Sequence, residues 1–282
     1  MTTIEQPLSG SVPLETDRVR EALVSGFRPT RPTALSTTLT FGWRAMLKIK
    51  HVPEQLLDVT MFPVMFVLMF TYLFGGALAG STEEYLQFLL PGILVQTVVM
   101  ISMYTGHTLN REVQRGVFDR IRSLPIWQPT VLLGMLMGDA ARYTMASTVI
   151  ITLGVVLGYR PDGGIEGVIG GVALVLLFSF SLSWVWTSLG LVMRTPEALM
   201  STSMMILFPL TFISNIFVDP ETMPGWLQPI VEANPISHLA TAVRSLMAGA
   251  PDGTEIGWVF TACAILVAVF APVTTYLYRN KN

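Results

Sequence analysis

The sequence predicts an all-α integral membrane protein with six transmembrane helices, an N-terminal amphipathic interfacial helix and outer re-entrant helices between spans five and six. Hydrophobic residues make up 51% of the 282 residues and charged residues only 13%, and the mean hydropathy is +0.57. These values are too apolar for an ordinary soluble domain. Long windows without any charge also indicate membrane spans, because a charge near the bilayer centre costs several kcal/mol.

Windows without Asp, Glu, Lys or Arg locate the spans, since about 20 helical residues cross the hydrocarbon core. Five such windows cover residues 59–82, 85–110, 167–193, 198–218 and 256–278. A sixth span is expected within 123–159, a run of 37 residues that only Asp139 and Arg142 interrupt. The six predicted spans lie near 57–79, 88–108, 135–158, 169–192, 198–218 and 257–278.

The distribution of Lys and Arg predicts the orientation, because these residues are enriched in cytoplasmic loops. Fourteen of the 17 lie before the first span, in the second and fourth loops, or after the last span. Arg160 and Arg244 lie in the third and fifth loops, and Arg142 lies within a span. We therefore expect a multi-pass protein of the plasma membrane with both termini in the cytoplasm.

The residues before the six-span domain, which covers 53–282, divide into two parts. Residues 1–33 carry four prolines among polar residues, which predicts a flexible cytoplasmic tail. Residues 34–52 are expected to form the interfacial helix, because apolar side chains recur at spacings of three or four, opposite two cations. This apolar face consists of Leu35, Leu39, Trp43, Met46 and Ile49. Packing on the protein itself is the alternative, but a Trp flanked by cations favours the membrane surface.

Residues 109–127, between spans two and three on the predicted cytoplasmic side, carry a second amphipathic pattern. Read as a helix, they show a continuous apolar stripe that charged side chains flank and Pro125 ends. The stripe consists of Val113, Val117, Ile121 and Leu124. Such a stripe fits a groove on another protein. An ordinary basic loop is the alternative, and it explains neither the stripe nor an exposed Phe118.

The connection 219–255, on the predicted outer side, contains apolar pieces punctuated by prolines. The pieces 223–231 and 236–247 are each too short to cross the membrane, so we predict two short helices. Re-entrant helices fit this pattern if protein or a wet cavity covers their backbone. The alternative is a soluble outer cap, which would expose Trp226, Leu227, Ile230 and Val231.

Short motifs in a fixed order connect these segments to a known family. They are Glu112-x-x-x-Gly116 running to Leu124-Pro125-Ile126, then Met223-Pro-Gly-Trp-Leu-Gln228, Asn234-Pro-Ile-Ser237 and Arg244. By their order, spacing and sidedness, the sequence after residue 34 resembles the permease subunits of type 2 ABC transporters, in particular the branch named for daunorubicin and doxorubicin resistance. The resemblance implies an ATP-driven exporter of hydrophobic or amphipathic compounds, such as a drug, an antibiotic or a lipid-like product.

The resemblance also implies roles for two segments. In the family, the segment between spans two and three is a coupling helix that contacts a separate ATPase subunit. This assigns docking to Glu112, Val113, Gly116, Val117, Phe118, Ile121 and Leu124. The outer helices help to close the exit, which assigns an outer gate to Trp226, Asn234, Pro235 and Arg244. Two permease copies and two ATPase subunits are implied, with the route at the permease interface.

No ATPase site is expected on this chain. A Walker A loop needs a Lys that follows Gly and precedes Ser or Thr, and none of Lys48, Lys50 and Lys281 follows a Gly. ATP and Mg are therefore assigned to the partner subunit. No cofactor is expected here, and a single cysteine, Cys263, excludes a cysteine-based metal cluster. The formal charge of -2 provides no basic excess for binding nucleic acid.

Two other functions compete with the exporter. Asp139 and Arg142 share a helical face, so Asp139 would be the coupling carboxylate of an ion-coupled secondary transporter. A structural ion pair near the cytoplasmic interface is the preferred interpretation, since the sequence has no evident inverted repeat or broken helix pair. An intramembrane enzyme is disfavoured, because the three histidines match no HExxH zinc motif and no GxSxG elbow occurs.

Substrate contacts are predicted on spans two and five, where polar side chains lie among methionine and aromatic ones. Such surfaces adapt to varied apolar ligands, and packing between helices is the alternative for each residue. The predicted pathway residues are Gln96, Met100, Ser201, Met204, Met205, Phe208 and Phe212. The partners expected in the membrane are lipid and a hydrophobic small molecule.

Overall fold

The computed structural model describes residues 53–78, 80–116 and 129–280, together with seven scattered positions between 33 and 47. Contacts divide the chain into two units, residues 1–33 and residues 34–282. The predicted tail lies outside the described residues except for Thr33. Most of the predicted interfacial helix and of segment 109–127 also lies outside them.

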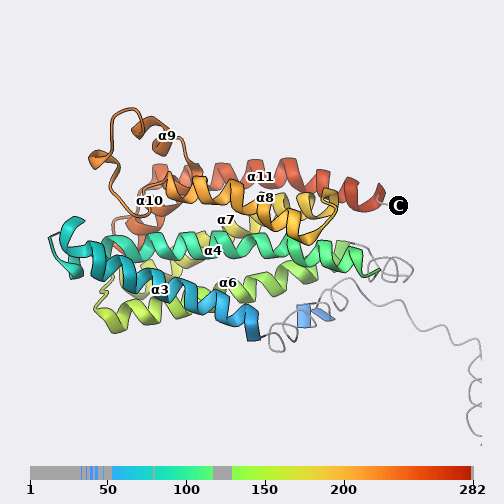
Figure 1. Cartoon of the computed structure of the whole chain (residues 1–282), viewed down its shortest axis with the longest axis horizontal. Helices are drawn as coiled ribbons and strands as arrows, with labels where there is room; N and C mark the ends of the chain where they lie inside the picture. The colour runs from blue at the N-terminus through green and yellow to red at the C-terminus, as the bar shows by residue number, and fades with distance from the viewer. Residues whose placement is uncertain are drawn as a thin grey trace, which may run out of the picture. The chain divides into compact units, whose positions relative to one another are not determined.

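Within the described residues, every regular element is a helix (Figure 1). The long helices are α3 (Pro53–Leu78), α4 (Thr82–Gln114), α6 (Pro129–Leu157), α7 (Gly164–Val192), α8 (Pro196–Phe212) and α11 (Gly253–Asn280). Three short helices lie between α8 and α11, namely η1 (Pro220–Thr222), α9 (Gln228–Glu232) and α10 (Pro235–Met247). The all-helical class predicted from composition is confirmed for this part of the chain.

Four of the described helices are long and apolar enough to cross a bilayer: Thr82–Gln114, Gly134–Leu157, Gly164–Val192 and Gly253–Arg279. A shorter apolar stretch, Met61–Gly76, lies in α3. α8 has 17 residues, about 26 Å of helix, which is near the lower limit for a span. The span predicted over 198–218 is therefore wrong at its end. The helix stops at Phe212, shortly after Pro209 has removed a backbone donor, and the chain bends through 213–218.

Local sequence explains where α8 and α10 begin. Thr195 Oγ1 accepts a hydrogen bond from Ala198 N at 3.1 Å, and Asn234 Oδ1 accepts one from the backbone N two residues later at 2.9 Å. Pro196 and Pro235 follow these caps at the first helical position. A proline is favourable there, because its missing N–H would have no partner within the helix.

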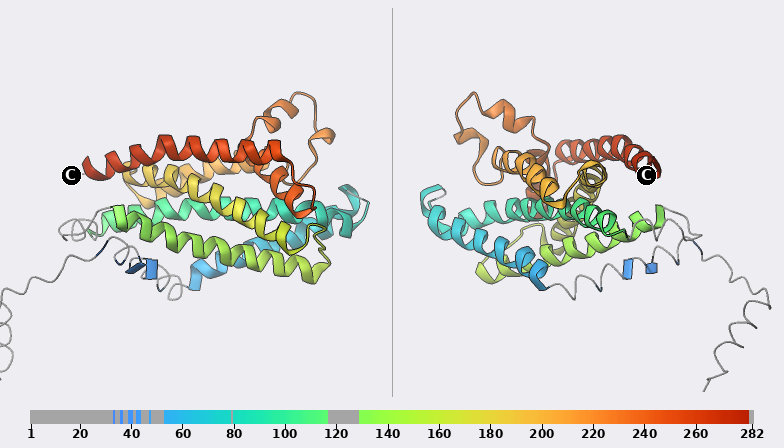
Figure 2. Two further views of the ribbon diagram at one scale, coloured as in Figure 1. Left: turned by 180° about the vertical axis from the view of Figure 1, so that it is seen from behind. Right: turned by 45° about the vertical axis from the view of Figure 1, so that its right-hand side comes forward.

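α4 and α7 pack along each other in the middle of the bundle, with α3 and α6 on one side and α8, α10 and α11 on the other (Figure 2). The two central helices approach very closely. A Cβ on Gly106 would lie 2.2 Å from Trp186 O, and one on Gly190 would lie 2.5 Å from Gly106 O. Trp186 Nε1 donates to Ser102 Oγ at 2.8 Å across the same contact. Small residues at these positions permit the close packing.

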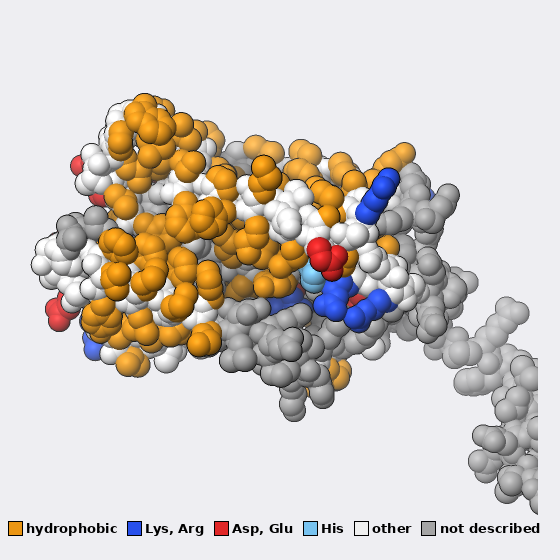
Figure 3. All heavy atoms as spheres, viewed as in Figure 1, with side chains coloured by type: hydrophobic (Ala, Val, Ile, Leu, Met, Phe, Trp, Pro, Cys, Tyr) orange, Lys and Arg blue, Asp and Glu red, His pale blue; other side chains and the backbone are white. Residues whose placement is uncertain are grey.

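The surface is apolar between two polar ends. Figure 3 shows hydrophobic side chains over the middle of the visible face and charged ones gathered toward its ends. Large apolar side chains such as Leu73, Met205 and Ile265 are exposed on three different helices. Such a surface suits the hydrocarbon of a bilayer, where charged side chains are expensive.

The described part of the predicted interfacial helix is exposed on its apolar face. Six positions between 36 and 47 are helical, and both Leu39 and Trp43 are exposed, Trp43 by 64%. Gly42 is buried, and a Cβ there would lie 3.5 Å from the side chain of Met137 on α6. The other residues of the apolar face, Leu35, Met46 and Ile49, lie outside the described residues. Placement at the membrane surface remains a prediction, which the exposure of Trp43 supports.

Segment 109–127 is not one continuous helix. α4 runs through the start of the segment and ends at Gln114, and Gly116 has φ +66°, the left-handed conformation that commonly ends a helix. The single helix predicted here is therefore wrong, because Val113 belongs to the same helix as the span. The remaining stripe and docking residues, Val117, Phe118, Ile121 and Leu124, lie outside the described residues.

The connection 219–255, predicted to lie outside, holds a buried helix and an exposed loop. α10 covers nearly the range predicted for the second short helix, and its apolar residues Ile236, Leu239 and Val243 are buried. It packs against α4, α7 and α11, so protein covers it, as a re-entrant helix requires. The first helix predicted, over 223–231, is wrong in extent: α9 covers only Gln228–Glu232, and Trp226 is 73% exposed before it.

Candidate functional site: a cavity between α3, α4 and α8

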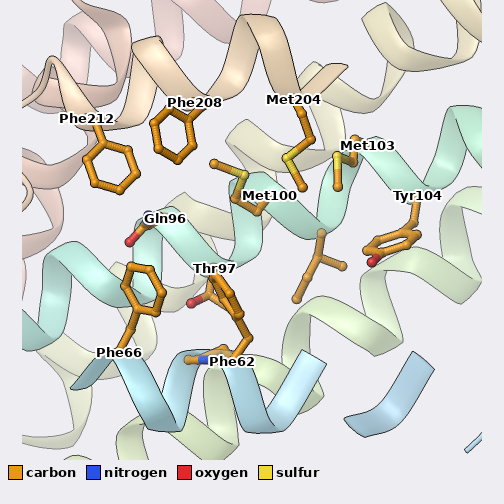
Figure 4. Close-up of a pocket in the computed structure, with 12 residues that line it drawn as sticks. Phe62, Phe66, Gln96, Thr97, Met100, Met103, Tyr104, Met204, Phe208 and Phe212 are labelled. Carbon is orange, nitrogen blue, oxygen red and sulfur yellow. The ribbon is translucent and has the colours of Figure 1, made fainter. Parts of the chain in front are cut away.

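Three helices line a cavity of about 310 Å³ (Figure 4). α4 forms the floor of this cavity, and α3 and α8 form its two walls. The lining residues are Phe62, Pro63, Phe66, Gln96, Thr97, Met100, Ile101, Met103, Tyr104, Met204, Phe208 and Phe212. The volume is at the lower end of the range for small-molecule pockets.

Aromatic pairs form the opposing walls. On α3, the rings of Phe62 and Phe66 lie 4.6 Å apart between centroids, and on α8 those of Phe208 and Phe212 lie 4.3 Å apart. Both pairs have the i, i+4 spacing that places side chains on one helical face. In Figure 4 the two pairs point toward each other across Gln96. Two aromatic walls of this kind suit a flat apolar group placed between them.

The floor combines polarizable and polar side chains. Met100, with Met204 of α8, contributes flexible thioether surface to the cavity (Figure 4), which adapts to irregular ligand shapes. Gln96 and Thr97 contribute an amide and a hydroxyl, and none of the lining residues carries a charge. The cavity therefore matches a largely apolar ligand with a few hydrogen-bonding groups.

The structure brings together most, but not all, of the residues predicted for the pathway. Gln96, Met100, Met204, Phe208 and Phe212 line the cavity. Ser201 and Met205 do not. Both are exposed, Met205 by 80%. Their place in the substrate pathway stays a prediction.

Sequence reasoning missed the α3 wall. Phe62 and Phe66 belong to a run of phenylalanines spaced by four residues that continues to Phe70 and Phe74. This spacing is visible in the sequence and predicts an aromatic ridge along one face of the helix. The partner of that ridge, α8, is more than 120 residues later in the chain, and no local pattern indicates it.

The cavity is open on one side. Phe62 and Phe208, which line it from opposite walls, are each 56% exposed. Met204 and Phe212 are also exposed in part, whereas Gln96 and Thr97 on the floor are buried. The lateral opening therefore lies between α3 and α8, opposite α4.

Asp139 and Arg142 lie apart from the cavity, in a buried polar cluster between α4, α6 and α7. Arg142 Nη1 donates to Asp139 Oδ1 at 2.8 Å, and Thr105 Oγ1 donates to Asp139 Oδ2 at 2.6 Å. The hydroxyls of Tyr143 and Ser183 are 2.8 Å apart in the same cluster. Both carboxylate oxygens thus have partners, as a buried charge requires.

The residues assigned to the outer gate fall into two groups. Asn234 and Arg244 make hydrogen bonds to the backbone at the end of α8, whereas Trp226 is exposed and Pro235 begins α10. Burial lowers the pKa of Arg244 to about 10, so its guanidinium stays protonated at neutral pH and remains a donor.

The described part of the predicted docking segment is anchored to α7. Asn110 Nδ2 donates to Gly190 O and Met193 O, at 2.8 Å each, and Gln114 Nε2 donates to Arg194 O. These bonds satisfy carbonyls at the end of α7, which have no helical partner. Glu112 and Val113 are half-buried on the same last turns of α4.

Comparisons with known proteins agree on one family. The family model described as ABC-2 type transporter matches residues 37–248. The chain is 54% identical to the daunorubicin resistance ABC transporter permease protein DrrB1 of Streptomyces coeruleorubidus over 282 residues, 100% of this chain and 99% of that protein. It is 26% identical over 217 residues to the doxorubicin resistance ABC transporter permease protein DrrB of Mycobacterium tuberculosis, covering 77% of this chain and 72% of that protein.

Proposed function

The chain belongs to the ABC-2 type transporter family as a permease subunit, and from this premise we propose that it forms the membrane pathway of a drug exporter. The full-length identity to a daunorubicin resistance permease supports a hydrophobic or amphipathic drug as the substrate. The single observation that carries this proposal is the uncharged aromatic cavity between α3, α4 and α8. ATP hydrolysis resides in a partner subunit of the transporter.

The cavity walls indicate how the substrate is held. A flat aromatic drug would lie between the rings of Phe66 and Phe212, with its polar edge toward Gln96. Aromatic pairs contribute about 0.5–1.5 kcal/mol each beyond the burial of apolar area. The opening between α3 and α8 leaves this site incomplete within one chain, which supports assembly with a second permease copy across the opening.

Substitution within the α8 wall tests the role of the cavity. Phe208→Ala removes a lining ring, and we expect it to raise the KM for daunorubicin about tenfold in the assembled transporter, because a stacking surface is lost. Ile206→Ala is the matched control, since Ile206 is about equally exposed on the same helix but does not line the cavity. Equal KM values for the two variants would exclude the cavity as the binding site.

The six-span arrangement with both termini in the cytoplasm is part of the proposal. The asymmetry of Lys and Arg supports it. Thr82 and Thr254, at the connections placed outside, are exposed and therefore accessible to a reagent. In a Cys263→Ala background, an impermeant thiol reagent outside intact cells should label cysteines at Thr82 and Thr254 but not one at Ser123. The opposite labelling pattern would reverse the orientation.

Reconstitution tests the division of labour between this chain and an ATPase subunit. Alone, the chain should neither hydrolyse ATP nor accumulate daunorubicin in inverted vesicles. Addition of the ATPase subunit should confer both activities, and substitution of that subunit's Walker A lysine should abolish both, because it neutralises phosphate charge. Transport by the isolated chain under a proton or sodium gradient would reject the proposal in favour of an ion-coupled transporter.

Co-purification of the ATPase subunit with variants of this chain tests the docking surface. Ile121→Asp places a charge on the apolar stripe, at a cost of a few kcal/mol if the contact is buried, and should remove the ATPase subunit during purification of the complex. Thr222→Asp introduces the same charge in the exposed outer loop and should leave co-purification unchanged. Full retention of the ATPase subunit by Ile121→Asp would remove the docking assignment.

A further inference from the structure

The end of α8 continues as a bent segment, residues 213–218, whose carbonyls are hydrogen-bonded by side chains from other helices. Asn234 Nδ2 donates to Leu210 O at 2.7 Å and to Ile213 O at 2.6 Å. Arg244 Nη2 donates to Asn215 O at 2.7 Å and to Ile216 O at 2.9 Å. Both donors come from the ends of α10, so this one short helix holds the bent segment at two places.

α4 completes this arrangement from the other side. Tyr85 OH donates to Phe217 O at 3.0 Å, and Arg244 Nε donates to Phe88 O at 2.9 Å while its Cζ lies 3.9 Å from the centroid of the Phe88 ring. Gly92 allows the close approach, since a Cβ there would lie 2.7 Å from Ile216 O. We call the hydrogen bonds from Asn234 and Arg244 to residues 210–216 the backbone clasp.

The segment that the clasp holds carries Phe217, which lies against both aromatic walls. Its ring centroid is 4.6 Å from that of Phe70 on α3 and 5.2 Å from that of Phe212 on α8. Phe70 in turn lies 5.5 Å from the cavity-lining Phe66. Phe217 is only 6% exposed. The rings form an uninterrupted arch across the end of the cavity that faces the outer loops.

We propose that Phe217 closes the cavity on the outer side, and that Asn234 and Arg244 are positioning residues that hold it closed through the backbone clasp. Outward release of the drug then requires the clasp to break. This inference rests on the proposed function, because it takes the cavity as part of the transport path.

The form of the clasp suits a movable closure. Its bonds join side chains of α10 to the backbone of another segment, so they can break without disrupting the hydrogen bonds within α8 or α10. Of the four carbonyls concerned, that of Leu210 belongs to the last turn of α8, and the other three lie beyond the helix. The charged guanidinium makes the stronger contacts, since hydrogen bonds from an ionised donor exceed neutral ones.

Accessibility of the cavity from outside tests the clasp independently of transport. The reporter is a cysteine that replaces Gln96 in the Cys263→Ala background. The full transporter complex is placed in right-side-out vesicles, and no nucleotide is added. An impermeant maleimide outside should label it slowly while the arch is closed. Asn234→Ser keeps a helix-capping side chain but loses the amide donor, and Arg244→Lys keeps the charge but loses the branched donor set. Each should accelerate labelling about tenfold.

Thr241→Val is the matched control, because it removes the 2.7 Å bond from Asn215 Nδ2 to Thr241 Oγ1 but touches no carbonyl of the segment. Its labelling rate should stay near that of the unsubstituted chain. An equal acceleration in this control would overturn the clasp and assign the effect to α10 packing as a whole. Unchanged labelling in both clasp variants would overturn it as well.

A reversible crosslink keeps the proposal testable if the clasp variants fail to fold. Cysteines at Phe70 and Phe217, joined by a short bifunctional methanethiosulfonate, should block daunorubicin export while the ATPase subunit stays bound, and a reductant should restore export. Export that persists in the crosslinked complex would overturn closure by Phe217. If the uncrosslinked complex exports no daunorubicin, the proposed function fails, and the labelling rates alone decide the closure.

Discussion

Gly106→Val is expected to remove nearly all folded protein from the membrane. A Cβ at this position would lie 2.2 Å from Trp186 O and 2.7 Å from its carbonyl carbon. These are backbone atoms within α7, so they cannot move aside unless the helix shifts. Overpacking of this kind costs about 3 kcal/mol or more, and here it acts at the contact between the two central helices.

The measurement is the amount of monodisperse protein that detergent extracts from the membrane, with Gly257→Val as the control. Gly257 lies in α11, and a Cβ there would have no neighbour within 4 Å. The control should accumulate normally and have an unchanged thermal unfolding midpoint. Equal yields of the two variants would mean that α4 and α7 do not pack as closely as described.

The second large effect is expected at the buried ion pair. Asp139→Ala would leave Arg142 buried without its partner, in a cluster where Arg142 Nε already has no hydrogen bond among the described residues. Removing one member of a buried pair typically costs about 3–5 kcal/mol. We therefore expect a sharp fall in the thermal unfolding midpoint of the complex, and a loss of export that follows the loss of folded protein.

The double variant Asp139→Leu with Arg142→Met separates a structural role from ion coupling. Replacing a buried pair by apolar residues of similar size is often neutral, so stability and ATP-driven export should largely return. In an ion-coupled transporter the carboxylate would be essential, and the double variant would stay inactive although folded. That second result would show that the Asp139 carboxylate takes part in transport.

Much of the architecture can be predicted from the sequence, because the bilayer imposes local requirements. Five of the six long helices overlap a charge-free window, and α6 overlaps the run that only Asp139 and Arg142 interrupt. Thr195 followed by Pro196 indicates where α8 begins. The early end of α8 was not predictable from hydropathy, since residues 213–218 are as free of charge as the helix before them. Their bent backbone depends on donors supplied by Asn234 and Arg244, which come later in the chain.

The candidate site, too, was predictable from the sequence only in part. Methionine and phenylalanine side chains on spans two and five indicated an adaptable apolar surface, and five of the seven predicted residues line the cavity. Ser201 and Met205 do not line it, and their place in the pathway stays a prediction. The α3 wall was missed, because the phenylalanine ridge shows a helix face but not the helix it meets.

The sequence by itself determined that this is a helical membrane protein, where its apolar segments lie and that it carries no Walker A lysine, since these properties depend on residues near one another in the chain. Only the tertiary structure decided that Phe62 and Phe66 face Phe208 and Phe212, and that Phe217 lies at the end of the cavity. Those contacts join α3 to the end of α8 through the packing of both on α4. Such packing depends on the combined shape of several helices, with close approaches at glycines such as Gly92, and no local sequence pattern encodes it.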